Sequence, residues 1–191
     1  DLHLSFRRQR QMCIRDSQYG GSLEDRMRFP LEIFEAVSKV WPKQKAIGVR
    51  FSATDWVDRS SWDIKESTEF AKELKKRGCN FIDVSSAGNS PEQQIEVGPG
   101  YQTAFASDIR RETGLATMAV GQITEPFQAE AIIRTGQADM VSIARGMLAD
   151  PRWAWHAAEA LGEQAAYAPQ YMRSNKSLRG LPIPGNPPVA K

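Results

Sequence analysis

Two glycine-containing turns carry the residue types that bind phosphate groups. Gly121 and Gln122 follow one apolar run of the chain, and Arg145 and Gly146 follow the next. Backbone N–H groups at such turns, with a helix start behind them and an arginine beside them, can form a cradle for an anion. The alternative is two ordinary glycine turns and a surface arginine. Two such turns on consecutive runs, one of them with an arginine, favour a phosphate site.

Arg50 and Ser86 are polar residues within or at the end of apolar runs, where they could bind a ligand. Arg50 lies within the apolar run GVRFS, where a buried charge is costly unless it meets an anion or an electron-rich ligand. A salt bridge to a neighbouring carboxylate such as Asp83 would explain it equally well. Ser85 and Ser86 end another apolar run, and their hydroxyl groups could donate to a ligand carbonyl or cap the following turn. Both positions stay open between ligand binding and a structural role.

Composition argues against several other kinds of site. The 191 residues include 25 basic and 23 acidic side chains, and a net charge of +2 does not indicate a basic face for nucleic acid. The cysteines, Cys13 and Cys79, and the histidines, His3 and His156, match no metal-ligand spacing. No apolar run approaches the roughly 20 residues of a membrane helix. We therefore expect a cytoplasmic protein with no metal and no membrane or nucleic-acid partner.

Helix-like and strand-like segments alternate at intervals of about 30 residues, which is typical of β/α units around a parallel sheet. Strands are expected at 46–52, 80–86, 116–121 and 139–144. Helices are expected at 22–40, 63–78, 124–136 and 150–161, with one more ending near 114. The side chains that indicate helix starts are Ser22, Asp63, Thr124 and Asp150. Pro30 predicts a kink or a late start in the first helix.

Four strand–helix units amount to half of a closed (β/α)₈ barrel, which needs about 250 residues. The sequence therefore predicts the α/β class and one half of a TIM barrel over residues 18–180. In such barrels the active site lies at the C-terminal ends of the strands, and the loops after the last two strands often bind phosphate. This placement agrees with the two glycine turns.

The two ends of the chain differ from this body in composition. Residues 1–17 carry the whole excess of positive charge and show no periodicity, as a disordered basic arm would. The string MCIRDS, residues 12–17, also resembles the translation of a transposon end used in sequencing adapters. We therefore expect the natural protein to begin near Gln18, with its upstream part missing. Residues 181–191 are proline-rich and are expected to form an extended tail.

Six segments resemble, in order and spacing, the C-terminal half of the old yellow enzyme family, most closely its bacterial xenobiotic-reductase subgroup. They are YGGSLEDRMRFPLEI (19–33), GVRFS (48–52), FIDVSS (81–86), AVGQIT (119–124), DMVSIARGMLADPRW (139–153) and PQYMR (169–173). The resemblance implies a TIM-barrel ene-reductase that uses FMN and NAD(P)H. A hydride would pass from the nicotinamide to the flavin and then to the β-carbon of an α,β-unsaturated carbonyl compound.

The resemblance also assigns individual residues. Arg50 matches the family arginine at the pyrimidine edge of the flavin, where a fixed cation stabilises negative charge on the reduced ring. Gly121 and Arg145 match residues that hold the FMN phosphate, and Gly146 lies beside them. Arg173 matches an arginine that some family dimers insert into the neighbouring subunit's active site, which implies a homo-oligomer.

The family's substrate-binding pair, two histidines or a histidine and an asparagine, and its tyrosine near the proton-donor position belong to the half that this chain does not match. No catalytic residue is therefore assigned here, and the chain alone is expected to be inactive. The alternative function is a non-catalytic half-barrel that associates with itself or binds a phosphate ligand.

Overall fold

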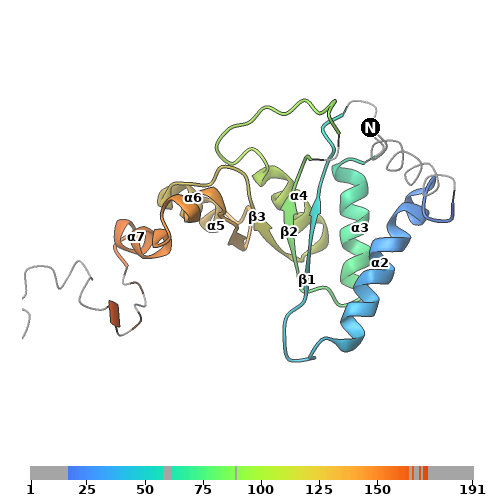
Figure 1. Ribbon diagram of the computed structural model, residues 1–191, viewed down its shortest axis with the longest axis horizontal. Helices are drawn as coiled ribbons and strands as arrows, with labels where there is room; N and C mark the ends of the chain where they lie inside the picture. Colours follow the sequence, from blue (N-terminus) through green and yellow to red (C-terminus); the bar gives the residue numbers. More distant parts are fainter. Residues whose placement is uncertain are drawn as a thin grey trace, which may run out of the picture.

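Four parallel strands form one sheet in the order β1-β2-β3-β4, with helices between consecutive strands (Figure 1). This computed structural model describes residues 17–57, 62–88 and 90–163, together with 165, 168, 170 and 171. The elements are α2 (Leu23–Val40), β1 (Gly48–Ser52), α3 (Ile64–Lys76), β2 (Phe81–Ser85), α4 (Thr103–Thr113), β3 (Ala116–Ala119), α5 (Pro126–Arg134), β4 (Met140–Val141), α6 (Arg145–Ala149) and α7 (Trp153–Ala160). The predicted α/β class with a four-stranded parallel sheet is confirmed.

Capping side chains start α2 and α3 where the sequence predicts. The hydroxyl of Ser22 accepts the backbone N–H three residues later, and the carboxylate of Asp63 accepts two N–H groups in the first turn of α3. α2 runs through Pro30, so the expected late start is wrong. The helix tolerates the missing N–H of Pro30 because Met27 and Phe34, on its inner side, are buried in the core.

The predicted cap of α5 is wrong. The helix begins at Pro126 with Glu125 as its N-cap residue, and no side chain caps it. Thr124 instead uses its backbone carbonyl, which accepts a hydrogen bond of 2.6 Å from the indole of Trp153. Phe127 lies in the first turn of α5 and is 66% exposed.

The last strand and the last helix are shorter than predicted. β4 ends at Val141, although the N–H of Ser142 still bonds to the carbonyl of Ala119 on β3 before the chain turns into α6. α7 begins at Trp153 with Arg152 as its N-cap residue. The side chain of Asp150 accepts the N–H of Arg152, so it closes the turn before the helix rather than capping the helix itself.

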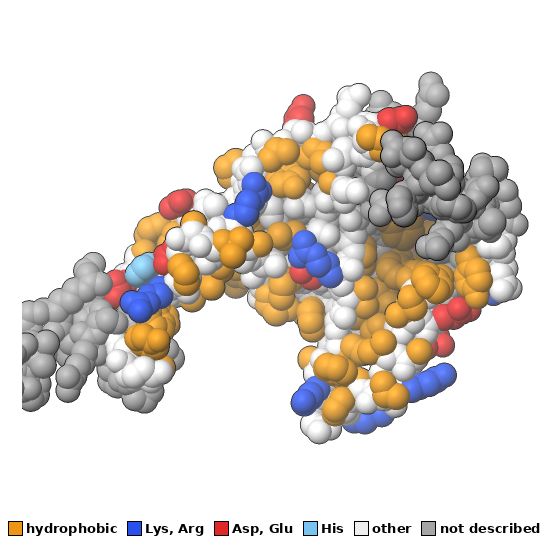
Figure 2. All heavy atoms as spheres, viewed as in Figure 1, with side chains coloured by type: hydrophobic (Ala, Val, Ile, Leu, Met, Phe, Trp, Pro, Cys, Tyr) orange, Lys and Arg blue, Asp and Glu red, His pale blue; other side chains and the backbone are white. Residues whose placement is uncertain are grey.

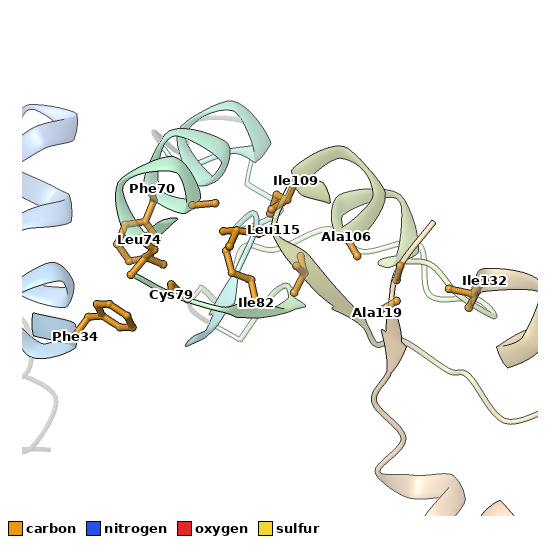
Figure 3. Close-up of a cluster of buried hydrophobic side chains, with 14 of the residues drawn as sticks. Phe34, Phe70, Leu74, Cys79, Ile82, Ala106, Ile109, Leu115, Ala119 and Ile132 are labelled. Atoms are coloured by element: carbon orange, nitrogen blue, oxygen red, sulfur yellow. The ribbon is translucent and has the colours of Figure 1, made fainter. Parts of the chain in front are cut away.

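Alternate residues of each strand face opposite sides of the sheet, and only one side is covered by helices. On β2, Ile82 and Val84 have no exposed surface, whereas Asp83 between them faces the other side. The covered side packs against α3 and α4, where Leu74 and Ile109 are also fully buried (Figure 3). The core therefore lies between the sheet and these two helices.

Apolar side chains also remain on the surface of α2. Phe29, Ile33, Val37 and Val40 recur at helical spacing and are 42% to 83% exposed. Figure 2 shows hydrophobic side chains gathered over this helix. An apolar stripe of this kind is typical of a surface that another protein segment covers.

An ion pair between α4 and the start of β4 predicts acid sensitivity. Both oxygens of Asp139 accept from Arg110, at 2.9 and 3.1 Å, and one also accepts the N–H of Thr117. The hydrogen bonds from Arg110, and then that from Thr117, lower the pKa of Asp139. A lowered pKa means that the carboxylate stabilises the fold above the ordinary aspartate value of about 3.9 and loses this effect as the pH falls through the folded-state pKa.

The variant Asp139→Asn is therefore expected to melt at a lower temperature than the wild-type chain at pH 7, with a smaller difference at pH 2.5. Thermal melting followed by circular dichroism at the two pH values checks this. A difference that is the same at both would show that the charge of Asp139 contributes nothing.

Candidate functional site

Backbone strain gathers at the C-terminal edge of the sheet. Among the described residues other than glycine, Trp56, Ala87 and Gln122 have positive φ angles, of 56°, 73° and 49°. Each follows the end of a different strand, β1, β2 and β3. Such a conformation costs on the order of 1–3 kcal/mol per residue, and it concentrates at functional sites. The strained edge is the one where the sequence predicts ligand binding.

A pocket of about 370 Å³ lies at this edge, after β3 and β4. It is lined by Gly121, Gln122, Arg145 and Gly146, so the structure brings together the residues of the two predicted turns. The other lining residues are Pro99, Tyr101, Gln102, Val120, Ile123, Thr124, Ser142, Ile143 and Ala144. None of the lining residues is acidic.

The two glycines are required by close contacts. Gly121 has a φ of 120°, and a Cβ there would lie 3.0 Å from Nε2 of Gln102 and 3.2 Å from the ring of Tyr101. A Cβ on Gly146 would lie 2.8 Å from Cγ2 of Ile143. A larger residue at either position would therefore push into the pocket wall.

The pocket offers hydrogen-bond donors that the protein itself does not use. Within the described residues, the backbone N–H groups of Gly121, Gln122 and Gly146 donate to no acceptor. The side chain of Arg145 is exposed and forms no ion pair with any carboxylate in that part of the chain. Free N–H donors, a cation and the lack of acidic residues match the chemistry of a phosphate group.

Arg50 forms the salt bridge to Asp83 that the sequence gives as the alternative to ligand binding. The two residues are register partners on β1 and β2, and Nη1 of Arg50 lies 2.6 Å from Oδ2 of Asp83. The aspartate side chain is 14% exposed and the arginine side chain 53%. Because one nitrogen makes this bond, the rest of the guanidinium remains open on the uncovered face of the sheet. The ion pair thus orients the cation without hiding it.

Ser85 and Ser86 both use their hydroxyl protons within the protein. Ser85 donates to the carbonyl of Phe51 at 3.1 Å. Ser86 accepts from the indole Nε1 of Trp56 at 2.8 Å and donates to Oε1 of Gln102 at 2.6 Å. Direct contact between Ser86 and a cofactor stays a prediction.

Sequence reasoning missed Trp56 and Gln102. Gln102 precedes α4 and follows a Gly-Pro-Gly turn at residues 98–100, and that turn was the only available signal that the segment returns to the sheet edge. Arg173 lies outside the described residues. Nearby Tyr171 packs with the ring of Trp155, and the guanidinium of Arg152 lies 5.2 Å from its ring centre.

A metal site and a membrane-spanning helix can be searched for in the described residues only. In that part of the chain, no three histidine, cysteine or acidic side chains come together as metal ligands would. No described helix has the length and apolar character needed to span a membrane.

Comparison with known proteins gives a consistent result. Residues 9–164 match the family described as NADH:flavin oxidoreductase / NADH oxidase. The NADPH dehydrogenases of Geobacillus sp. (strain WCH70) and Bacillus subtilis (strain 168) are 45% and 42% identical over 159 residues, which is 83% of this chain and 46% of each relative. The chain therefore spans about half the length of these relatives.

Solved structures give the same fold. 2-Naphthoyl-CoA reductase matches with a TM-score of 0.68 and 22% identity, over 78% of this chain and 23% of that one. Morphinone reductase matches with a TM-score of 0.59 and 23% identity, over 82% of this chain and 40% of that one. These neighbours are TIM-barrel proteins, and the four-stranded sheet corresponds to part of their barrel. The sequence matches and the shared fold together show that the chain belongs to the NADH:flavin oxidoreductase family, the old yellow enzymes.

Proposed function

We propose that this chain binds the phosphate end of FMN in the pocket after β3 and β4, as part of an NAD(P)H:enone oxidoreductase. The observation that carries the proposal is the set of unused donors around that pocket, from Gly121, Gln122, Gly146 and Arg145. The family uses FMN and a nicotinamide reductant. When bound, FMN supplies hydride transfer from the nicotinamide to the β-carbon of an α,β-unsaturated carbonyl compound.

Each pocket residue has a distinct task in this proposal. The backbone N–H groups of Gly121, Gln122 and Gly146 donate to the phosphate oxygens, and Arg145 neutralises their charge. Arg50 places a cation at the pyrimidine edge of the ring, oriented by its bond to Asp83. Ser86 belongs to the proposed site through its position at the end of a strand, and Arg173 through family resemblance alone.

Substrate binding is assigned to the rest of the protein. The residues that grip the substrate carbonyl belong to the family's other half, and we propose that Arg173 reaches the active site of a neighbouring subunit in a homo-oligomer. The small-molecule enone substrate and the cytoplasmic location stay predictions.

A direct test joins this chain to the part of the Bacillus subtilis relative that it does not span. The joined protein is expected to bind FMN and to convert 2-cyclohexenone to cyclohexanone with NADPH, as measured by gas chromatography. Oxidation of NADPH without cyclohexanone formation would contradict the enone assignment and leave only a flavin oxidoreductase.

The second candidate function is a non-catalytic half-barrel that associates with itself. The exposed apolar stripe of α2 and the uncovered face of the sheet favour it. Purification distinguishes the two candidates, because a flavin-binding chain retains a yellow colour and a self-associating one gives a colourless dimer.

A further inference from the structure

Gln102 is a buried polar residue on the wall of the phosphate pocket. Its side chain and backbone together are 4% exposed, yet it lines the pocket beside Gly121. A Cβ on Gly121 would come within 3.0 Å of Nε2 of Gln102, so the amide nitrogen lies directly against that turn. None of the assignments above gives this residue a role in binding.

Two hydrogen bonds favour one orientation of the amide of Gln102. The indole N–H of Trp56 can only donate, so the oxygen of Ser86 accepts from it at 2.8 Å. The proton of Ser86 is then free to be donated to Gln102 at 2.6 Å, a length typical of O–H···O bonds. The structure places the carbonyl oxygen of Gln102 toward Ser86, in agreement with this short length, and the NH₂ group faces away from it.

The NH₂ group of Gln102 has no acceptor within the described residues. Nε2 of Gln102 is not among the fully buried side-chain atoms that lack a partner in the described residues, so this nitrogen keeps some contact with solvent although the residue as a whole is buried. The two N–H donors lie beside a pocket that already presents backbone N–H groups and an arginine. A phosphate group in that pocket would give these donors a charged acceptor.

We propose that Gln102 is a further phosphate-binding residue, whose Nε2 donates to a phosphate oxygen of FMN. Trp56 and Ser86 are positioning residues, since they act by holding the amide in this orientation. The inference rests on the proposed function, because it requires FMN in this pocket. It adds a side-chain donor from the start of α4 to the two turns after β3 and β4.

The variant Gln102→Glu tests the inference with a minimal change of shape. It keeps an oxygen that accepts from Ser86 and replaces the NH₂ donor by an oxygen that repels phosphate. In equilibrium dialysis with the full chain, FMN affinity is expected to fall about 10- to 100-fold, the effect of losing a hydrogen bond to a charged group. Riboflavin, which lacks the phosphate, is expected to bind the variant and the wild-type chain equally.

Two further variants separate binding from folding. Gln137→Glu makes the same substitution after α5, where the amide donates to Thr135 away from the pocket, and it is expected to leave FMN affinity unchanged. Ser86→Ala keeps Gln102 but removes the hydrogen bond that orients its amide. FMN affinity is expected to fall about two- to fivefold, less than the loss of a hydrogen bond to a charged group would cause. Circular dichroism melting confirms that each variant is folded before its affinity is compared.

Each outcome decides between the two proposals. A selective loss of FMN affinity in Gln102→Glu supports the role of Gln102. Unchanged FMN affinity, or an equal loss for riboflavin, overturns that role while leaving the proposed function intact. If Gln102→Glu does not fold, unchanged FMN affinity in Ser86→Ala overturns it instead. A folded wild-type chain that does not bind FMN overturns the proposed function and this inference together.

Discussion

The chain alone, supplied with FMN and NADPH, is expected to reduce 2-cyclohexenone no faster than free flavin does. It retains the pocket proposed to bind phosphate and the cation of Arg50, which are proposed to bind FMN rather than the substrate. Hydride transfer also requires the substrate to be held close to the flavin in a reactive geometry, and that contribution can reach roughly 7–11 kcal/mol. Since no described residue is assigned to hold the substrate carbonyl, this contribution is expected to be absent.

The comparison that checks this result uses the same assay on two proteins. The isolated chain should give the free-flavin rate, and the chain joined to the remaining part of the Bacillus subtilis relative should exceed it by orders of magnitude. Clear cyclohexanone formation by the isolated chain would be the contrary result. It would mean that paired copies of the chain rebuild a working site.

Replacing Arg145 with alanine in the joined protein is expected to weaken FMN binding by about 1.5–3 kcal/mol, the range for a hydrogen bond to a charged group. The reason is that Arg145 is the one cationic side chain among the described lining residues of the pocket, and it has no carboxylate partner there to compete with a phosphate. Fluorescence titration of FMN measures the change.

Arg134→Ala is a matched control for this substitution. Arg134 is also an exposed arginine, but it pairs with Glu130 on α5 and does not line the pocket. Its removal should leave FMN affinity unchanged. Equal FMN affinity in Arg145→Ala and the wild type would show that Arg145 is a surface arginine with no part in FMN binding.

The starts of helices could be predicted from the sequence where a single capping side chain determines them. Ser22 and Asp63 are good caps because their side chains bond to N–H groups within three residues, which depends on nothing elsewhere in the chain. Thr124 does not cap α5, because the helix begins one residue later, after Glu125, and the carbonyl of Thr124 accepts from Trp153, nearly thirty residues along the chain.

Some residues of the candidate site could be predicted from the sequence, and others depend on contacts that only the folded chain makes. Gly121, Gln122, Arg145 and Gly146 could be predicted because parallel strands bring their C-terminal ends to one edge of the sheet. Gln102 could not, since its orientation depends on contacts between two separate loops, the one after β1 and the one after β2. The ion pair of Arg50 was predicted only as an alternative, because strand register determines which carboxylate lies opposite.

The most direct test of the account compares FMN with riboflavin as ligands of the wild-type chain. The two flavins share the ring and the ribityl chain and differ in the phosphate, which carries a charge of about −1.5 to −2 at pH 7. If the pocket after β3 and β4 binds that phosphate, equilibrium dialysis should show FMN binding about 10- to 100-fold more tightly than riboflavin. Equal affinity for the two flavins would contradict the phosphate site on which the proposed function rests.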